Sequence, residues 1–252
     1  MTRIYTDRYC KKSIIKAIGY EKDELKEYAQ LLADKLNLQL ERDAKTCLFV
    51  SVEKLALKIP SFSLLSTDFS AHTWSKRRGE GKKQGLLRAC KPAKGIKILD
   101  ATAGWGRDAA LLASFGAEVI MLERHPVMAA LLADALSRRN ELDKQKMHLS
   151  LIEMDAFSYL YNLSNQEYPD VIYIDPMHPE RSKSALVKKE MQALQQMIGT
   201  DNDALELIKM ALSRVNLRVV VKWPQKIKPL LAPHASVEGK TVRFDIYRPH
   251  AF

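Results

Sequence analysis

Short apolar runs that alternate with helical patterns dominate the chain from about residue 96 onward. The runs have the β-branched and aromatic content of buried strands and lie at 96–99, 118–123, 147–155, 171–174 and 217–224. Segments with apolar residues at helical spacing lie between them or follow them, at 107–113, 127–136, 156–163, 185–197 and 203–213. Strands that alternate with helices predict an open α/β sheet whose strands are mostly parallel.

The last strand pattern differs from the others. Residues 241–247 alternate with period two, which is typical of an antiparallel strand, and we expect this strand at the edge of the sheet. The predicted fold is therefore a Rossmann-like, mostly parallel sheet that ends in an antiparallel edge hairpin, and its resemblance to known sheets of this class implies seven strands.

The first part of the chain lacks this alternation and predicts a separate small domain. Residues 23–38 have apolar side chains at helical spacing, and 47–52 have the pattern of a strand. We therefore expect an α+β appendage over residues 1–69 and the larger domain over 70–252. The appendage either helps to hold a substrate or covers the sheet.

A glycine turn after the first strand of the larger domain predicts a ligand site. Asp100 ends the strand, Gly104 and Gly106 follow, and a helix begins at Arg107. Glycines allow positive φ angles and close approach of the backbone to a ligand. The free N–H groups of the helix start favour an anionic or carboxylate-bearing ligand. Such a turn lies at the carboxyl end of the first strand in dinucleotide-binding sheets.

A second acid supports an adenosine-containing cofactor. Glu123 ends the next strand, about twenty residues on, where this kind of fold places the carboxylate that binds a ribose. The spacing of Gly104, Gly106 and Ala109 also fits the dinucleotide pattern, so a nicotinamide-dependent dehydrogenase is an alternative.

Two motifs favour S-adenosylmethionine (SAM) over a nicotinamide. The run from Asp100 to Gly106 reads D-x-x-x-G-x-G, which resembles motif I of Rossmann-like methyltransferases. The run 175–179, D-P-M-H-P, resembles the D/N-P-P-aromatic motif with which that superfamily methylates exocyclic amines of bases. Methionine replaces the second proline of that motif, and His178 takes the aromatic position. The alternative of a nicotinamide-dependent dehydrogenase does not explain the second motif.

The chemistry of an exocyclic amine explains why an acid and a proline are needed there. The lone pair of the amine is delocalised into the base, so its N–H groups need well-placed acceptors. Asp175 and the carbonyl of Pro176 can supply them, and positioning and electrostatics then carry most of the catalysis. His178 either stacks on the base or is an exposed loop histidine. Asp155 lies where methyltransferases bind the adenine amino group, and it can also cap the helix that begins at Ala156.

Composition limits the class of protein. The formal net charge is +10, which suits a polyanionic partner. Three scattered cysteines and widely spaced histidines argue against a disulfide scaffold and a metal site. No apolar run approaches the roughly 20 residues that span a bilayer, and no signal peptide is seen, so we expect a soluble cytoplasmic protein.

A basic segment precedes the first strand of the larger domain and either contacts nucleic-acid phosphates or is solvated. Its candidate residues are Arg77, Arg78, Lys82 and Lys83.

Several longer runs resemble one family, the bacterial ribosomal small subunit methyltransferase J family. They are D-A-T-A-G-W-G-R-D-A, M-L-E-R-H-P-V, Y-I-D-P-M-H-P, K-S-A-L-V-K-K-E-M and R-F-D-I-Y, between about residues 68 and 247. The resemblance implies SAM-dependent methylation of a guanine N2 amine near the 3′ end of 16S rRNA. It implies SAM contacts at Arg107, Asp108, Glu123, Arg124, Asp155, Ala156 and Asp175.

The same family resemblance directs attention to a second basic group. Lys183, Lys188 and Lys189 follow the D-P-M-H-P motif closely and either contact rRNA phosphates or lie on a solvated helix face. Two alternatives to the rRNA activity stay open: an adenine-N6 or DNA base methyltransferase, and a non-catalytic RNA-binding assembly factor.

Overall fold

The structure is a computed structural model that describes residues 14–60, 62–74, 84–176 and 203–249. The described residues form two compact units. The smaller unit contains residues up to 68 together with 125–138, and the larger unit contains the described parts of 69–124, 139–176 and 201–249. The helix at 125–138, which the sequence pattern placed within the larger domain, thus belongs to the smaller unit. A domain division at residue 69 stays a prediction.

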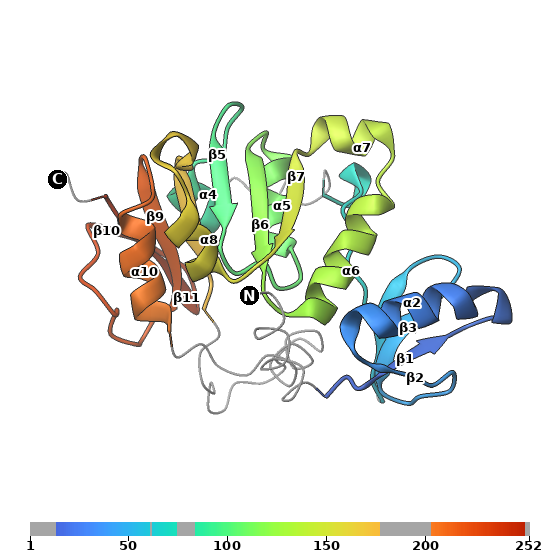
Figure 1. The fold of residues 1–252 in the computed structure, drawn as a ribbon. Helices are drawn as coiled ribbons and strands as arrows, with labels where there is room; N and C mark the ends of the chain where they lie inside the picture. Colours follow the sequence, from blue (N-terminus) through green and yellow to red (C-terminus); the bar gives the residue numbers. More distant parts are fainter. Residues whose placement is uncertain (1–13, 61, 75–83, 177–202, 250–252) are drawn as a thin grey trace. The chain divides into compact units, whose positions relative to one another are not determined.

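The larger unit is built on a seven-stranded sheet, as the sequence pattern predicts (Figure 1). The strand order is β10-β11-β9-β8-β5-β6-β7. The five strands from β9 to β7 are parallel, and β10 and β11 are antiparallel to their neighbours. The strands are β5 (Lys97–Asp100), β6 (Glu118–Glu123), β7 (Leu149–Glu153), β8 (Val171–Ile174), β9 (Arg218–Pro224), β10 (Ala235–Glu238) and β11 (Val242–Tyr247).

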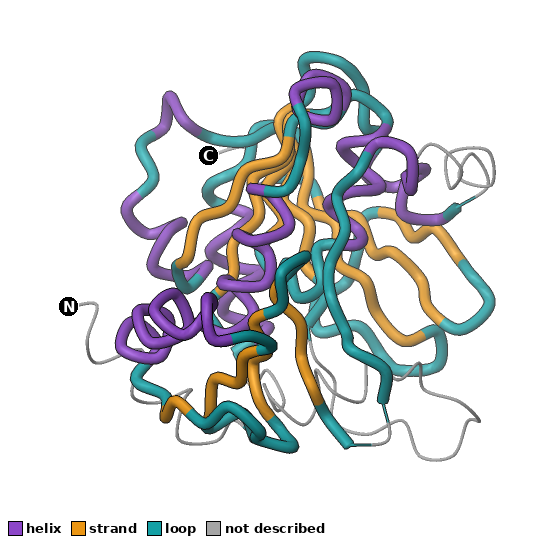
Figure 2. The backbone as a smooth tube through the Cα atoms, turned by 90° about the vertical axis from the view of Figure 1, so that its right-hand side faces the viewer, coloured by secondary structure: helices purple, strands orange, loops and turns teal. Residues whose placement is uncertain are grey.

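Helices cover both faces of this sheet, which explains why its central strands are apolar on both sides. In Figure 1, α8 (Ala156–Asn162) and α10 (Ala204–Leu212) lie in front of the strands, and α4 (Gly85–Cys90) and α5 (Arg107–Ser114) lie behind them. All four residues of β8 are buried as a result. Figure 2 shows the strands side by side, with a progressive twist. This unit also contains α7 (Glu141–Lys146), the 3₁₀ helix η2 (Asn165–Glu167) and a helical turn at residues 71–74.

The main apolar core lies between the sheet and the pair α8 and α10. It includes Leu160 of α8, Ile208 of α10 and the strand residues Ile172, Val219 and Val221, which are at most 1% exposed. The core holds the carboxyl ends of β5, β8 and β9 at one edge of the sheet. The chain leaves β5 toward β6 on one side, while β8 pairs with β5 on the other. That is the switch point at which open α/β sheets bind their ligands.

The antiparallel hairpin is confirmed, but the predicted place of its second strand is wrong. The strand pattern at 241–247 appears as β11, which lies between β9 and β10 rather than at the edge. The edge strand is β10, and three of its four residues are exposed. A strand with so little apolar content has no periodicity that sequence reasoning can detect.

The smaller unit has its own four-stranded sheet with the order β2-β1-β3-β4. β1 pairs in parallel with β2 and β3, and β3 and β4 form an antiparallel pair. The predicted helix at 23–38 appears as η1 and α2, and the predicted strand at 47–52 appears as β3. The elements are β1 (Ala17–Tyr20), η1 (Asp23–Leu25), α2 (Lys26–Leu36), β2 (Gln39–Leu40), β3 (Cys47–Val50), β4 (Leu55–Lys58) and α6 (Pro126–Ser137).

An α+β appendage is therefore present in the described residues. Helix α2 packs on β1, and α6 contacts β4. The guanidinium of Arg138 donates a hydrogen bond of 2.7 Å to the carbonyl of Thr67, which joins the end of α6 to the end of the N-terminal segment. Within the described ranges, no helix is long and apolar enough to cross a membrane.

Candidate active site

The glycine turn predicted from the sequence connects β5 to α5. Gly104 and Gly106 have φ angles of 53° and 68°, a region that favours glycine. Gly106 is the N-cap of α5, and no side chain caps this helix. The turn is tightened by a 2.8 Å hydrogen bond from the Gly106 N–H to the Ala103 carbonyl. A glycine at the N-cap leaves the start of α5 without the capping side chain that Ser, Thr, Asp or Asn would provide there, which suits a ligand-binding turn.

Glu123, at the end of β6, holds this turn from the neighbouring strand. Its side chain is 5% exposed, and its Oε2 accepts a 2.9 Å hydrogen bond from the Gly104 N–H. The backbone adds a second link, since the Ala103 N–H donates to the Leu122 carbonyl at 3.1 Å. The acid predicted to bind a ribose thus also positions the turn that would surround the cofactor.

A lysine links the cofactor side of the site to the predicted catalytic acid. Lys222 of β9 places its Nζ 2.7 Å from Oδ2 of Asp175 and 3.1 Å from Oδ2 of Asp108. Asp175 directly follows β8, and Asp108 lies in the first turn of α5. The Tyr173 hydroxyl donates to the same Asp108 oxygen at 2.6 Å. The Asp175 N–H donates to Oγ1 of Thr102 at 2.7 Å.

Burial and charge set the protonation states in this cluster. Burial alone lowers the pKa of Lys222, but the Asp175 and Asp108 carboxylates outweigh this effect and raise the pKa well above its usual value. Burial, together with the Asp108 and Asp175 charges, raises the pKa of Tyr173, so its hydroxyl stays a donor. Burial also raises the pKa of Asp100 to about 8, with smaller contributions from neighbouring acids. Lys222 is therefore a permanent cation, whereas Asp100 is mainly neutral at pH 7.

The Asp155 carboxylate makes two contacts just after β7. Its Oδ1 accepts a 3.0 Å hydrogen bond from the Ser158 N–H and so caps α8, as the sequence suggests. Its Oδ2 lies 3.6 Å from the guanidinium of Arg124, which also contacts Asp203 at 3.1 Å. The described residues contain no group of three or more acids, cysteines or histidines that could hold a metal ion.

The structure brings the described candidates to one edge of the larger sheet. Asp100 ends β5, Gly104 and Gly106 lie in the turn that follows, and Arg107 and Asp108 begin α5. The acids Glu123, Asp155 and Asp175 end or follow β6, β7 and β8. Arg124, Ala156 and the buried Pro176 come directly after three of these acids. The other predicted residues lie outside the described part of the chain: His178, Arg77, Arg78, Lys82, Lys83, Lys183, Lys188 and Lys189. The roles of individual residues stay predictions.

Sequence reasoning missed three members of the cluster. Thr102 and Tyr173 belong to runs whose other residues already explain the turn and the strand. Lys222 did leave a signal, because it is a charged residue between the buried residues Val221 and Trp223 of a strand. A charged residue in a buried strand needs a partner, and the carboxyl end of the sheet is where that partner would be expected.

Comparisons with known proteins agree with this geometry. Residues 31–249 match the family model described as "Putative SAM-dependent methyltransferase". The chain is 76% identical over 235 residues to the ribosomal RNA small subunit methyltransferase J of Legionella pneumophila (strain Corby), covering 93% of this chain and 97% of that protein. The chain belongs to the ribosomal RNA small subunit methyltransferase J family.

Other members of the family and a solved structure extend the comparison. The methyltransferase J of Coxiella burnetii (strain Dugway 5J108-111) is 47% identical over 190 residues, covering 73% of this chain and 74% of that protein. The crystal structure of a SAM-dependent methyltransferase from Neisseria gonorrhoeae superposes with a TM-score of 0.68 at 28% identity, covering 94% of this chain and 97% of that one. The family resemblance and the Rossmann-like methyltransferase fold inferred from the sequence are confirmed.

Proposed function

We propose that this protein transfers a methyl group from SAM to the exocyclic N2 amine of a guanine near the 3′ end of 16S rRNA. The observation that carries the proposal is the Asp175 carboxylate, which Lys222 holds 2.7 Å away at the carboxyl end of β8. This contact supports a role for Asp175 as a fixed acceptor beside the glycine turn of a methyltransferase fold. The family name of its relatives gives the rRNA of the small subunit as the substrate class. Such a substrate would place the protein in the cytoplasm.

The residues at the sheet edge fit the cofactor. The uncapped start of α5 suits a carboxylate, the buried Glu123 suits the hydroxyls of a ribose, and Asp155 suits an adenine amino group. Asp108 and Asp175 suit cationic groups, since both already bind the Lys222 ammonium. SAM supplies an electrophilic methyl group when bound. The protein's own contribution is to hold the acceptor amine in line with it.

The fixed geometry of Asp175 explains how a weakly nucleophilic amine could react. Lys222 contacts Oδ2 of this carboxylate, and Thr102 binds the backbone N–H of the same residue. The carboxylate therefore has little freedom to rotate away from a substrate. An amine that donates an N–H to this carboxylate is more electron-rich at nitrogen and so a better nucleophile. The same acceptor stabilises the positive charge that develops on the nitrogen as the new bond forms. The buried Pro176 fixes the backbone that follows.

The direct test is to map the modifications of 16S rRNA by mass spectrometry in cells that lack the gene. We expect loss of one N2-methylguanosine near the 3′ end. Wild-type protein should restore it, and the Asp175→Ala variant, which removes the carboxylate, should not. An unchanged rRNA map in the deletion strain would refute the proposal. Restoration of the methyl group by Asp175→Ala would show that the reaction does not depend on this carboxylate, whereas a normal cellular phenotype and RNA binding in that variant without the methyl group would support a role in ribosome assembly without catalysis.

A further inference from the structure

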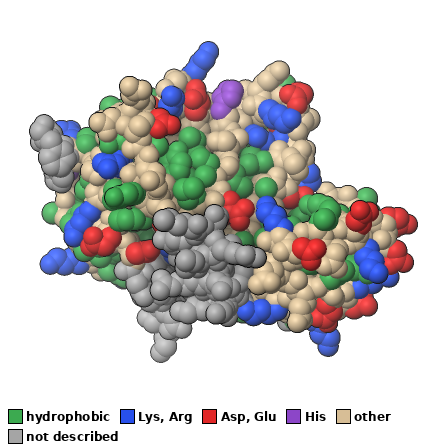
Figure 3. Space-filling model, in the orientation of Figure 1, with side chains coloured by type: hydrophobic (Ala, Val, Ile, Leu, Met, Phe, Trp, Pro, Cys, Tyr) green, Lys and Arg blue, Asp and Glu red, His purple; other side chains and the backbone are tan. Residues whose placement is uncertain are grey.

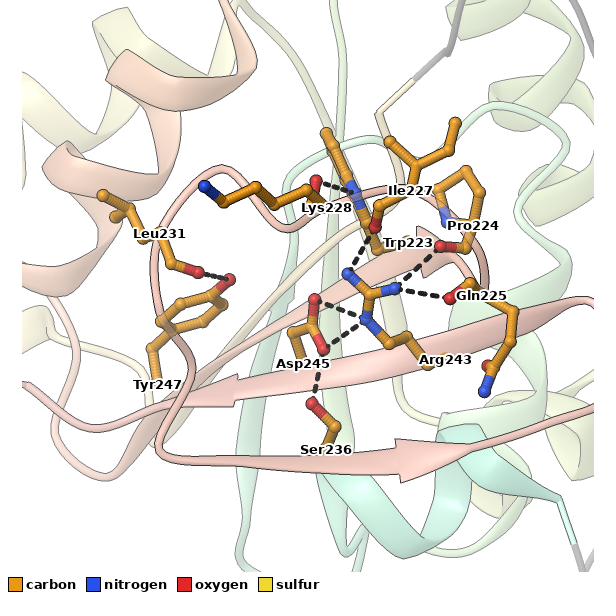
Figure 4. Close-up of polar contacts among 10 residues, drawn as sticks. All are labelled: Trp223, Pro224, Gln225, Ile227, Lys228, Leu231, Ser236, Arg243, Asp245 and Tyr247. Atoms are coloured by element: carbon orange, nitrogen blue, oxygen red, sulfur yellow. Dashed lines mark hydrogen bonds and ion pairs between the residues drawn. The ribbon is translucent and has the colours of Figure 1, made fainter.

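The segment that follows β9 is fixed to the sheet by several side-chain hydrogen bonds. This segment, the β9–β10 loop (residues 225–234), lies between the strand that carries Lys222 and the edge strand. Arg243 of β11 provides most of the contacts. Its Nη1 donates to the carbonyls of Pro224 and Gln225 at 2.9 Å each, and its Nη2 donates to the carbonyl of Ile227 at 2.8 Å. Figure 4 shows these three carbonyl groups converging on one guanidinium.

Two aromatic side chains bind the rest of the β9–β10 loop. The indole N–H of Trp223 donates to the carbonyl of Lys228 at 3.0 Å, and the Tyr247 hydroxyl donates to the carbonyl of Leu231 at 3.1 Å (Figure 4). The backbone adds a hydrogen bond of 3.1 Å from the Gln225 N–H to the Thr241 carbonyl. Three β-sheet side chains thus satisfy carbonyl groups along most of the loop, so the loop is preorganised rather than free to change its conformation.

Arg243 is itself held by a buried acid. Asp245 is fully buried, and its two carboxylate oxygens accept from the Arg243 Nε at 2.9 and 3.1 Å. Ser236 of β10, directly opposite Asp245 in the sheet, donates a 2.6 Å hydrogen bond to the same carboxylate. A buried ion pair of this kind contributes little net stability, because the cost of removing both charges from water offsets their attraction. Its effect here is to orient the guanidinium toward the loop.

The groups that the fixed loop presents to solvent are basic and apolar. Lys226, Lys228, Ile227 and Leu230 are exposed, the last two by 50% and 39%. No acidic residue occurs between residues 222 and 234. Basic and acidic side chains are interspersed over the described surface on the face shown in Figure 3. Within the loop itself, no acidic residue offsets the charges of Lys226 and Lys228, which complement a polyanion.

The loop also lies next to the candidate active site. Its first residue is three positions after Lys222, whose Nζ contacts Asp175, and an extended chain advances about 3.3 Å per residue. The loop begins at the carboxyl end of β9, the same edge at which β5, β6 and β8 end. A nucleic acid whose base reaches Asp175 would have its flanking nucleotides within reach of this loop.

We propose that the β9–β10 loop is a preformed binding element for the rRNA segment that flanks the target base. Lys226 and Lys228 contact phosphates, and Ile227 and Leu230 lie against sugars or bases. This inference rests on the proposed function, because it takes the partner to be rRNA. A rigid loop favours binding since the entropy of ordering it has been lost during folding and not on association.

The test compares two pairs of lysines in the full-length protein. Lys226→Ala/Lys228→Ala removes the loop charges, and Lys94→Ala/Lys97→Ala removes two exposed charges at the opposite, amino end of β5. The probe is 16S rRNA from cells that lack the gene, as naked RNA and in small-subunit particles. We expect the loop variant to bind the better of these two substrates about 2- to 30-fold more weakly, with unchanged affinity for SAM. The slope of log K against log salt should become shallower by about 1.4, or roughly 0.7 for each lost contact.

The control pair and one further variant make the result decisive. If the wild type methylates rRNA, either of two results would overturn the proposal about the loop. One is an equal loss of rRNA affinity in both lysine-pair variants, and the other is no loss of affinity in the loop variant. Failure of the wild type to bind or methylate rRNA would overturn the proposed function instead. Arg243→Lys keeps a cation beside Asp245 but cannot bind three carbonyls, so it should weaken rRNA binding without changing the salt slope. Unchanged affinity in that variant would refute preorganisation of the loop.

Discussion

The buried acid at the end of β5 makes a prediction about how stability depends on pH. Asp100 is 1% exposed, and burial raises its pKa from 3.8 to about 8. Between these two pKa values, such a carboxyl group binds more protons in the folded state than in the unfolded state. The stabilisation that Asp100 contributes to the folded state is therefore fully present below about pH 4 and is lost as the pH rises through 8. Asp100→Asn should remove this dependence, because an amide does not ionise.

The size of the effect follows from the linkage relation. Each unit of pH between the two pKa values changes the free energy of unfolding by about 1.4 kcal/mol. Between pH 5 and pH 8, the wild type should therefore lose roughly 3 to 4 kcal/mol relative to Asp100→Asn. The substitution should preserve the turn, because the Asn carbonyl can still accept the 3.1 Å hydrogen bond from the Thr102 N–H.

The assay is equilibrium unfolding in urea at several pH values for both proteins. Only the difference between the two curves is interpreted, since other groups that titrate in this range are common to both. Glu238→Gln, which changes an exposed carboxylate of β10 in the same unit to its amide, is the matched control for this type of substitution. A difference between wild type and Asp100→Asn that does not change with pH would show that Asp100 is ionised at neutral pH and would refute the reasoning.

Three further predictions concern the other charged groups of the site. Lys222→Met should leave Asp108 and Asp175 without the cation that binds them, which should lower the free energy of unfolding by about 2 to 3 kcal/mol and reduce methylation at least tenfold. Lys222→Arg should recover part of the stability and part of the activity. Full activity in the Met variant would contradict the role assigned to Lys222. Glu123→Gln should raise the Kd for SAM about tenfold by calorimetry, whereas an unchanged Kd would exclude a ribose contact. Asp155→Ala should cost about 1 kcal/mol in urea unfolding through loss of the α8 cap. Asp155→Asn should keep the cap and lose only SAM affinity, so equal destabilisation by both changes would show that the charge, not the cap, is what matters.

The main parts of the site could be predicted from the sequence because each depends on a local sequence rule. The glycine turn, the helix start at Arg107 and the acid at Glu123 each follow from the requirements of a strand that ends at a ligand. The structure agrees with all three, and the bounds of β6 and β8 match the apolar runs. The antiparallel hairpin could be predicted as well, but the order of its two strands in the sheet could not. The edge strand β10 is too short and too exposed to leave a pattern.

Contacts between residues that are far apart in the sequence could not be predicted from local patterns. Lys222 and Asp108 are 114 positions apart, and nothing in either local pattern identifies the other. The same holds for the Arg243 guanidinium and the carbonyls of the β9–β10 loop, because a backbone carbonyl has no sequence signature. In both cases, the sequence does show a charged residue in a strand with buried positions. It indicates that a partner is needed without saying which partner is chosen.

The distribution of charge explains why the substrate contacts should lie away from the catalytic centre. Asp100, Asp108, Glu123 and Asp175 gather at the ends of β5, β6 and β8, and Lys222 is bound by two of them. Even with Asp100 neutral, Asp108, Glu123 and Asp175 present carboxylates where the cofactor is expected, which favours the cationic sulfonium and ammonium of SAM and opposes a phosphate backbone close to them. An enzyme with such a centre must bind RNA through its rim and admit only the uncharged base. The β9–β10 loop, which is free of acids and fixed beside this centre, meets that requirement.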